Sequence, residues 1–537
     1  MDDTASLRTL LVGIDAACDR VLAGLFEDDE VPTLESIYRD GTGGALESQI
    51  PPWTASAWPS LYTGKNPGKH GVFGFLSFDG YDWDVVNATD VREPTLWEIL
   101  DDHGITSVVV NAPVTHPTRA FDGALIPGYT APEDPDCHPD GLLEEVRGEV
   151  GEYRVYPDDD EPDRGRAHAD CVRQRGEAFR YLADRFDPAF GFLQFQGTDS
   201  IFHEEPGNEA AVRTIYRELD RQLEATLVEY DPDTVIVASD HGMGPYRGVE
   251  FRINDYLRTE GLLETRRGGD GMPSWATVRD DALKRGEDAA AHEPGLGERA
   301  MAQAARFGLT SQRIGTALER VGLADAVATI APASVVSAGA TQVDFAESTA
   351  YVRSRIECGV RINLEGREPD GVVPPAEYEA IRTRLIDALR SVHAPDGQPV
   401  FETVAPREEY FHGPESERAV DVVTVPADFE HFLSASLRDE QFGPPSEPWN
   451  HKLEGTIALR GAGVDPAAGV GNAHLFDVAP TVLATLDVPA CDRMDGTALP
   501  CVDPVGTRSY PRTDSERSVA TDDADVEQRL ADLGYLE

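Results

Sequence analysis

Lysine is scarce in this chain of 537 residues, where it occurs only four times, at positions 65, 69, 284 and 452. The 47 basic residues face 97 acidic ones, which gives a net charge of −50. Such a surface argues against nucleic acid and anionic membrane as partners, because binding to phosphate groups requires basic side chains. Acidic residues occur along the whole chain, which predicts a folded surface adapted to abundant counter-ions, as in a salt-rich cytoplasm.

Paired cysteines and long apolar runs are also missing. The six cysteines are scattered without a Cys-x-x-Cys pair, which argues against a disulfide framework and fits a reducing compartment. The apolar stretch at residues 7–17 is too short to span a membrane, and no basic leader region precedes it. We therefore expect a soluble, cytoplasmic protein with no membrane partner.

The order of strand and helix patterns predicts an α/β core with an insertion. Sequence patterns typical of buried strands alternate with helical patterns over residues 1–247 and again over 420–505. Between them, residues 248–419 predict an inserted α+β cap, with two amphipathic helices at 298–330, strands within 343–364 and a helix at 374–393. Residues 420–425 are expected to rejoin the core sheet. Residues 506–537 are expected to form a polar tail that ends in a short helix.

One apolar run, residues 235–238, leads directly to Asp240 and His241, and glycines follow at 242 and 244. The run is typical of a buried parallel strand, and open α/β sheets hold their ligands at the carboxyl ends of such strands. A strand followed by an ordinary polar turn explains the same sequence equally well. Asp240 and His241 alone do not decide between the two interpretations.

Two more predicted strands end on carboxylates. Residues 7–15 end at Asp15, which could be a ligand or simply cap the helix that follows. Residues 190–199 end at Asp199, and His203 comes four residues later, on the same face if a helical turn begins there. His451 precedes another strand, at 456–459.

Thr54 follows a pair of prolines at the point where a helix is expected to begin. A hydroxyl in this position is most often a helix cap. The same position also suits an anion, because free backbone N–H groups and the helix dipole attract phosphate there. Both interpretations remain open from the local sequence.

Taken together, these residues predict a metal centre. Because parallel strands lie side by side, their carboxyl ends meet at one rim, where three carboxylates without cations would repel one another. Two divalent metals would resolve this, and mixed carboxylate and imidazole ligands suit zinc, with manganese or iron as alternatives. A metal pair stabilises displacement at phosphorus, and Thr54 is the obvious nucleophile. The six predicted ligands are Asp15, Asp199, His203, Asp240, His241 and His451.

These motifs resemble the alkaline phosphatase superfamily, specifically its type I phosphodiesterase/nucleotide pyrophosphatase family, nearly end to end and in the expected order. The cap is most similar to phosphodiesterases of archaea. The resemblance implies a three-layer core around a mostly parallel sheet and hydrolysis of a small phosphate ester or nucleotide through a phosphothreonine intermediate. It also implies two metal sites, one formed by Asp15, Thr54, Asp240 and His241, and the other by Asp199, His203 and His451.

One departure from the family pattern leaves the substrate open. Nucleotide pyrophosphatases have a phosphate-binding Asn where this chain has Phe75, and Lys65, Lys69 or Asn111 are the substitutes that the sequence offers. Diester, monoester and pyrophosphate substrates all remain. A mutase-type phosphotransferase is an alternative, although such enzymes mostly use Ser as the nucleophile. A non-catalytic binding protein is a weaker alternative, since all six expected ligands and the hydroxyl of Thr54 are present.

Overall fold

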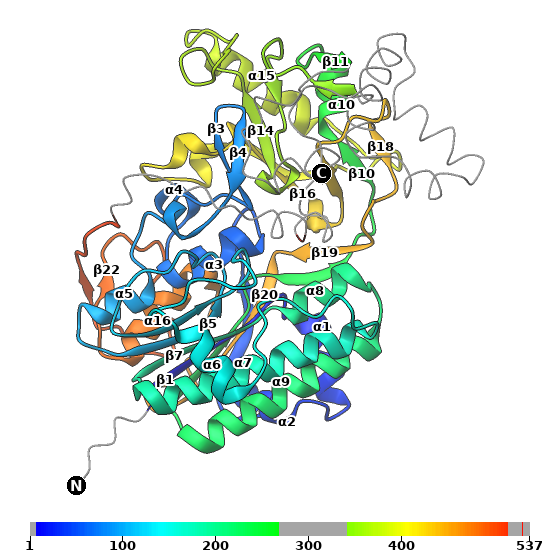
Figure 1. The fold of residues 1–537 in the computed structure, drawn as a ribbon. Helices are drawn as coiled ribbons and strands as arrows, with labels where there is room; N and C mark the ends of the chain where they lie inside the picture. The colour runs from blue at the N-terminus through cyan, green and yellow to red at the C-terminus, as the bar shows by residue number, and fades with distance from the viewer. Residues whose placement is uncertain (1–6, 268–340, 514–528, 530–537) are drawn as a thin grey trace.

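The computed structural model describes residues 7–267, 341–513 and 529 (Figure 1). Its centre is an eight-stranded sheet in the order β21-β2-β20-β8-β1-β7-β5-β6. The neighbouring pairs from β8 through β6 are parallel, while β20 runs antiparallel to both β8 and β2. This confirms the predicted α/β class with a mostly parallel sheet. The strands are β1 (Thr9–Ile14), β2 (Thr42–Glu47), β5 (Ser107–Ala112), β6 (Gly123–Pro127), β7 (Phe190–Phe195), β8 (Thr234–Ala238), β20 (Glu454–Gly461) and β21 (Ala473–His474).

The middle strands are buried on both faces because helices cover the sheet on each side. Every residue of β1, β5, β7 and β8 is buried, as their apolar sequences predict. On one face α7 packs against β5 and β7, while α2 packs against β2 and β20; on the other, α5 contacts β5 and α16 contacts β1 and β8 (Figure 1). The helices of this unit are α1 (Asp19–Glu27), α2 (Pro32–Asp40), α3 (Thr54–Thr63), α4 (Pro67–His70), α5 (Leu96–Asp101), α6 (Leu142–Val150), α7 (Arg164–Phe186), α8 (Gly197–Glu204), α9 (Glu209–Tyr230) and α16 (Val478–Thr485).

A second unit lies above the carboxyl ends of these strands and has its own apolar core (Figure 1). It contains a four-stranded sheet, β13-β14-β16-β15, and a three-stranded sheet, β17-β10-β18. Its elements are α10 (Ile253–Thr259), α15 (Tyr378–Arg390), β10 (Glu250–Arg252), β11 (Thr265–Arg267), β12 (Thr341–Val343), β13 (Ala350–Tyr351), β14 (Gly359–Ile362), β15 (Phe401–Pro406), β16 (Val422–Pro426), β17 (Phe432–Ser434) and β18 (Phe442–Gly443). The β3 (Leu76–Asp79) and β4 (Asp82–Val85) hairpin reaches up to it, and Tyr81 packs on its core.

One expectation about the path of the chain is wrong. Residues 420–425 do not rejoin the core sheet, because β16 pairs with β14 and β15 in the second unit. The chain returns to the large sheet later, at β20, after the short ribbon formed by β19 (Trp449–Lys452) and β9 (Gly242–Pro245). An apolar strand pattern indicates that a strand is buried, but it does not indicate which of two sheets the strand joins. This explains the error.

Other expectations concern residues that the structure does not describe. The two helices predicted at 298–330 lie outside the described residues, as does the C-terminal helix apart from Arg529. The remaining short strands, β22 (Ala490–Cys491) and β23 (Thr507–Arg508), form a ribbon near the C-terminal end. All six cysteines are free and buried. Within the described ranges, we find no helix with the length and apolar character that crossing a membrane requires.

Candidate metal centre

Three neighbouring strands bring the predicted ligands to one rim of the sheet. In the parallel register, Ile14 of β1 lies beside Phe195 of β7, and Gly13 lies beside Ala238 of β8. Asp15 follows β1 directly, Asp240 comes two residues after the end of β8, and Asp199 lies in the first turn of α8, just after β7. Their convergence is therefore a consequence of the sheet order.

The first group consists of Asp15, Asp240 and His241, all buried, with one potential ligand atom of each within 4.8 Å of the others. His241 Nε2 lies 3.1 Å from Asp240 Oδ2 and 3.6 Å from Asp15 Oδ1. Strand β8 ends at Ala238 and β9 begins at Gly242, so Asp240 and His241 lie in the break between the two strands, where their side chains reach the same point. The other imidazole nitrogen, Nδ1, lies 3.1 Å from the carbonyl oxygen of Gly242, which orients the ring.

Thr54 completes this group as the first residue of α3. Its side chain is fully buried, and its Oγ1 lies 3.2 Å from His241 Nε2. Trp53 before it is extended, so the helix begins at the threonine itself. The hydroxyl thus lies where the first N–H groups of α3 have no partner within the helix, a position that favours an anion.

The second group consists of Asp199, His203 and His451. Oδ1 of Asp199 lies 3.5 Å from His203 Nε2 and 3.3 Å from His451 Nε2, and the two imidazole nitrogens are 3.2 Å apart. The first two residues share a face of α8, as their four-residue spacing predicts. His451 comes from β19, whose pairing with β9 places it opposite Met243, close to the first group.

The two groups adjoin through their histidines. The rings of His241 and His451 stack with centroids 3.6 Å apart and an angle of 19° between their planes. His451 Nδ1 lies 2.9 Å from the carbonyl oxygen of Pro52, two residues before Thr54. The hydroxyl, both carboxylates of the first group and the second group therefore form one continuous cluster.

This cluster has the chemistry of a metal site. Burial raises the pKa of Asp15 well above its usual range, and the carboxylates of Asp240 and Asp199 raise it further. Burial, followed by the neighbouring His241, lowers the pKa of His451 to about 3. Among the described residues, Asp15 Oδ1 and Asp240 Oδ2 are buried without a hydrogen-bond partner. Cations would satisfy these oxygens and relieve the repulsion, so the residues fit a metal pair.

Two residues that the sequence analysis did not single out hold Asp15 in place. Trp58 Nε1 donates a hydrogen bond to Asp15 Oδ2 at 2.8 Å, and Gln194 Nε2 donates to the same oxygen at 3.0 Å. Trp58 lies one turn after Thr54 on α3, so the helix that carries the hydroxyl also orients a carboxylate. Gln194 had a signal in the sequence, because it is a lone polar side chain within the apolar strand β7.

The suggested substitutes for the missing phosphate-binding Asn have other partners. Phe75 is buried and packs on Tyr129. Lys65 lies 3.2 Å from Glu93, and Lys69 contacts Asp495 at 2.5 Å. Asn111 is buried, and its Nδ2 donates to Gln194 Oε1, so it orients the amide that holds Asp15. These contacts favour structural roles for all three polar residues.

Solved structures with similar folds cover nearly the whole chain. Phosphonoacetate hydrolase from Sinorhizobium meliloti 1021, in complex with phosphonoformate, matches with a TM-score of 0.55 and 16% identity, over 90% of this chain and 95% of its own. Wild-type alkaline phosphatase PafA matches with a TM-score of 0.53 and 12% identity, over 93% of this chain and 99% of its own. These likenesses show the alkaline-phosphatase-like fold. No curated protein matches the chain.

The sequence also matches a known family over more than half of its length. Residues 9–304 match the type I phosphodiesterase / nucleotide pyrophosphatase family. This range includes Asp15, Thr54, Asp199 and the Asp240–His241 pair, which the structure places in one buried cluster. The chain therefore belongs to the type I phosphodiesterase / nucleotide pyrophosphatase family and is a metal-dependent hydrolase of phosphoric esters.

Proposed function

We propose that this protein hydrolyses phosphodiester or nucleotide pyrophosphate bonds with two metal ions and the hydroxyl of Thr54 as the nucleophile. The observation that carries the proposal is the position of Thr54 Oγ1, 3.2 Å from His241 Nε2 inside the first ligand group. A threonine used only as a helix cap would have no reason to lie beside three buried ligand residues.

We assign the residues of the cluster to two sites. Asp15, Asp240, His241 and Thr54 would hold one ion, and Asp199, His203 and His451 would hold the other, with zinc best suited to these ligands. When bound, such ions lower the pKa of hydroxyl groups and stabilise negative charge on the attacking and leaving oxygens. Burial by itself raises the pKa of Asp15, and bound cations would offset this by stabilising the ionised carboxylate.

The chain's own groups then define the reaction. Thr54 Oγ1 would form a bond to phosphorus as the bond from phosphorus to the leaving alcohol or phosphate oxygen breaks, and the threonine proton would pass to that oxygen or to solvent. Water would then hydrolyse the phosphothreonine, which releases the phosphoryl group and restores the hydroxyl. Two displacements retain the configuration at phosphorus. The first N–H groups of α3 face the phosphoryl oxygens. Trp58 and Gln194 fix Asp15, and the carbonyl of Pro52 orients His451 through Nδ1.

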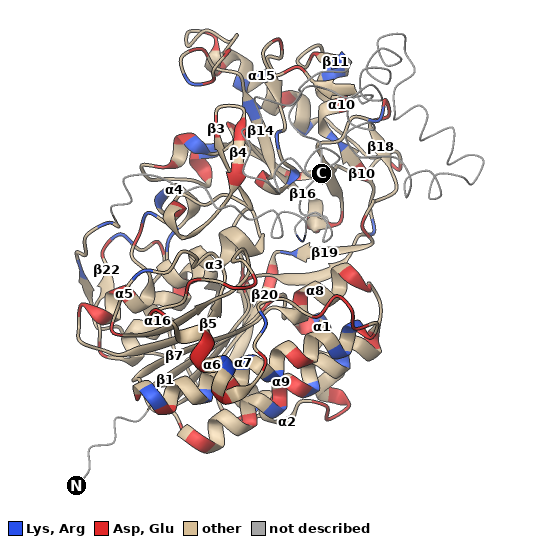
Figure 2. Ribbon diagram, viewed as in Figure 1, with Lys and Arg blue, Asp and Glu red and all other residues tan. Residues whose placement is uncertain are grey.

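We further propose that the protein works in a salt-rich cytoplasm. Its net charge is −50, and Figure 2 shows Asp and Glu on elements of both the core and the second unit. Charge of one sign spread over the whole surface destabilises a compact chain unless counter-ions screen it. The same charge disfavours duplex nucleic acid as a substrate.

Hydrolysis assays in molar potassium chloride with zinc or manganese test the proposed activity. We expect turnover of bis-p-nitrophenyl phosphate and of a p-nitrophenyl nucleotide diester, with p-nitrophenyl phosphate hydrolysed more slowly. Thr54→Ala should lower kcat by about a thousand-fold or more, because the covalent route is lost. Mass spectrometry of acid-quenched enzyme should detect phosphate on the peptide that contains Thr54.

Thr63→Ala is the matched control, since Thr63 ends the same helix and its hydroxyl donates a hydrogen bond to the Pro59 carbonyl, within the helix. It should keep the wild-type rate. Undiminished turnover by Thr54→Ala would refute the nucleophile, while a metal-loaded wild-type enzyme that hydrolyses none of the three esters would refute the proposed function.

A further inference from the structure

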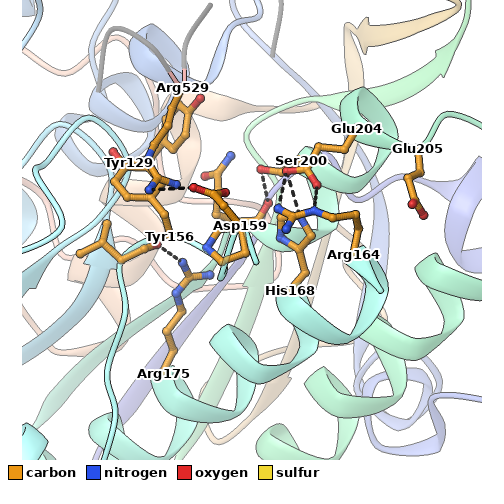
Figure 3. Close-up of a pocket in the computed structure, with 14 residues that line it drawn as sticks. Tyr129, Tyr156, Asp159, Arg164, His168, Arg175, Ser200, Glu204, Glu205 and Arg529 are labelled. Carbon is orange, nitrogen blue, oxygen red and sulfur yellow. Dashed lines mark hydrogen bonds and ion pairs between the residues drawn. The ribbon is translucent and has the colours of Figure 1, made fainter. Parts of the chain in front are cut away.

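The three ligand residues of the second group are held in place by different parts of the protein. Asp199 and His203 lie on α8, and the last residue of this helix, Glu204, accepts a 2.7 Å hydrogen bond from Arg164 of α7. Both partners of this bond line the cavity drawn in Figure 3, between α7 and α8. His451 lies instead on β19, outside the large sheet. Its position therefore depends on the contacts that fix β19.

Asn450 precedes His451 on β19 and bonds through both ends of its side-chain amide. The residue is 0% exposed. Its Oδ1 accepts a hydrogen bond from the backbone N–H of His451 at 2.7 Å, and its Nδ2 donates to Glu447 Oε2. The amide thus connects the backbone of a predicted metal ligand to a carboxylate three residues earlier in the chain.

The other oxygen of Glu447 binds an arginine of the second unit. Arg355 begins the short 3-10 helix η4 (Arg355–Glu357), just before β14, and its Nη2 donates to Glu447 Oε1 at 2.7 Å. The arginine side chain is only 2% exposed, whereas that of Glu447 is 22% exposed. Because a buried guanidinium group without its carboxylate is costly, this ion pair fixes Glu447 on the second unit.

The same guanidinium group also contacts the segment that carries the nucleophile. Arg355 Cζ lies 5.5 Å from the centre of the Trp53 ring, within the range of a cation–π contact. The Trp53 ring lies 4.6 Å from the ring of His451, and Thr54 is the next residue along the chain. The contacts therefore close on themselves. We name this set the Arg355 network, and it consists of Arg355, Glu447, Asn450, His451 and Trp53.

We propose that Glu447 is a positioning residue of the metal centre, which holds His451 in place through Asn450 and is itself held by Arg355. This inference rests on the proposed function, which assigns a second ion to the group that includes His451. A metal ligand that outer contacts hold in the binding geometry binds its ion more tightly. The second unit thus contributes to metal affinity, although the six proposed ligands lie outside its sheets.

Zinc titration of the full chain against a competing chelator, in molar potassium chloride, tests the inference. Glu447→Gln keeps the size of the side chain but places an NH₂ group against the donors of Asn450 or Arg355. Asn450→Asp keeps an acceptor for the N–H of His451 but places a second carboxylate against Glu447. Each variant should bind one of the two zinc ions about 10- to 100-fold more weakly and the other as the wild type does.

The double variant Glu447→Gln/Asn450→Asp exchanges donor and acceptor and so can restore the hydrogen bonds. The new amide donates to the new carboxylate, and its oxygen still accepts from Arg355. The second oxygen of the new carboxylate still accepts from the N–H of His451. Most of the lost zinc affinity should return. If the two losses simply added, or if the single variants bound both ions like the wild type, the role of Glu447 would be refuted.

Glu357→Gln is the matched control, because it breaks another ion pair of the same short helix. The Glu357 carboxylate lies 2.6 Å from Arg353, and both side chains are 5% exposed. We expect this variant to melt at a lower temperature but to bind both zinc ions with wild-type affinity. If it weakened one ion as much as Glu447→Gln does, the effect would be a general loosening of the second unit, and the positioning role would be wrong.

The titration also separates this inference from the proposed function. A wild-type protein that binds two zinc ions, with single variants that bind them equally well, would overturn the inference and leave the proposed function intact. A folded wild type that binds no zinc would instead refute the two-metal function and the inference that rests on it. Circular dichroism of each variant at the titration temperature shows that the chain is folded.

Discussion

Trp58 Nε1 donates a 2.8 Å hydrogen bond to Asp15 Oδ2, and this bond links the helix of the nucleophile to a carboxylate of the metal centre. Trp58→Phe removes the donor but keeps an aromatic ring near Phe192, 5.8 Å away. Loss of a group that orients a ligand typically weakens metal binding. We therefore expect the affinity for one zinc ion to fall by about 10- to 100-fold. Titration with zinc against a competing chelator measures it.

Trp97→Phe provides the control for this prediction. Trp97 is also buried and lies 6.5 Å from Phe192, but its contacts belong to the apolar core. We expect wild-type zinc affinity from this variant, with a comparable change in melting temperature. If both tryptophan variants bound zinc like the wild type, the Trp58 bond would have only a structural role.

The two ligand groups should lose their ions separately. Asp240→Asn removes a carboxylate from the first group, and His203→Ala removes an imidazole from the second. With two ions in the wild type, each variant is expected to retain one after dialysis, because the other group keeps its own ligands. Inductively coupled plasma mass spectrometry gives the metal content per chain.

The exposed His393 supplies a control for the histidine variant, and His393→Ala should retain both ions. Loss of both ions from Asp240→Asn and from His203→Ala would show a cooperative centre rather than two separate sites. Full occupancy in either variant would remove that residue from the ligand set.

Salt should decide whether the protein stays folded. The 97 acidic residues, against 47 basic ones, repel one another. The Debye length over which this repulsion acts is about 3 Å in molar salt but about 30 Å in centimolar salt. We expect the melting temperature, followed by circular dichroism, to fall steadily as potassium chloride is diluted from molar to millimolar levels. Mild acidification at low salt should restore part of the stability, since it neutralises carboxylates. A melting temperature independent of salt would contradict the adaptation.

Much of the metal centre could be predicted because its residues follow clear local patterns. Asp15 and Asp240 each end an apolar run, so the strand positions also fix where their side chains gather. The spacing of Asp199 and His203 matches one helical turn, and the structure has that turn in α8. His451 was harder to place, because its position depends on the pairing of β19 with β9, which no local pattern encodes.

The surroundings of α7 and the second unit show why other features could not be predicted. Arg175 reads as an ordinary charged residue of a long helix, and it is buried only because the segments around Tyr129 and Tyr156 fold over α7. Likewise, β16 has the same apolar pattern as a core strand, and only its partners β14 and β15 assign it to the second unit. Burial by distant segments is a tertiary property that sequence periodicity does not contain.

Asp421, next to β16, should make the stability of the second unit depend on acid. The residue is buried, and Arg367 donates to both its oxygens at 2.7 Å. Burial raises the pKa of Asp421, but the hydrogen bonds and charge of Arg367 outweigh this and lower it to about 2. Since the pKa is lower in the folded than in the unfolded chain, the ionised group stabilises the fold above about pH 4, and this contribution is lost as the pH falls toward 2.

Asp421→Asn tests this dependence through urea unfolding in molar salt. At neutral pH the variant should be less stable by about 1.5–3 kcal/mol, because Arg367 and Arg407 would lose a charged hydrogen-bond partner, while Arg367 keeps its ion pair with Glu368. The difference from the wild type should shrink as the pH falls from about 4 toward 2. The exposed Asp387 of α15 serves as the control, and Asp387→Asn should differ little from the wild type throughout. A gap for Asp421→Asn that stayed constant down to the lowest pH would show that its ionisation does not stabilise the fold.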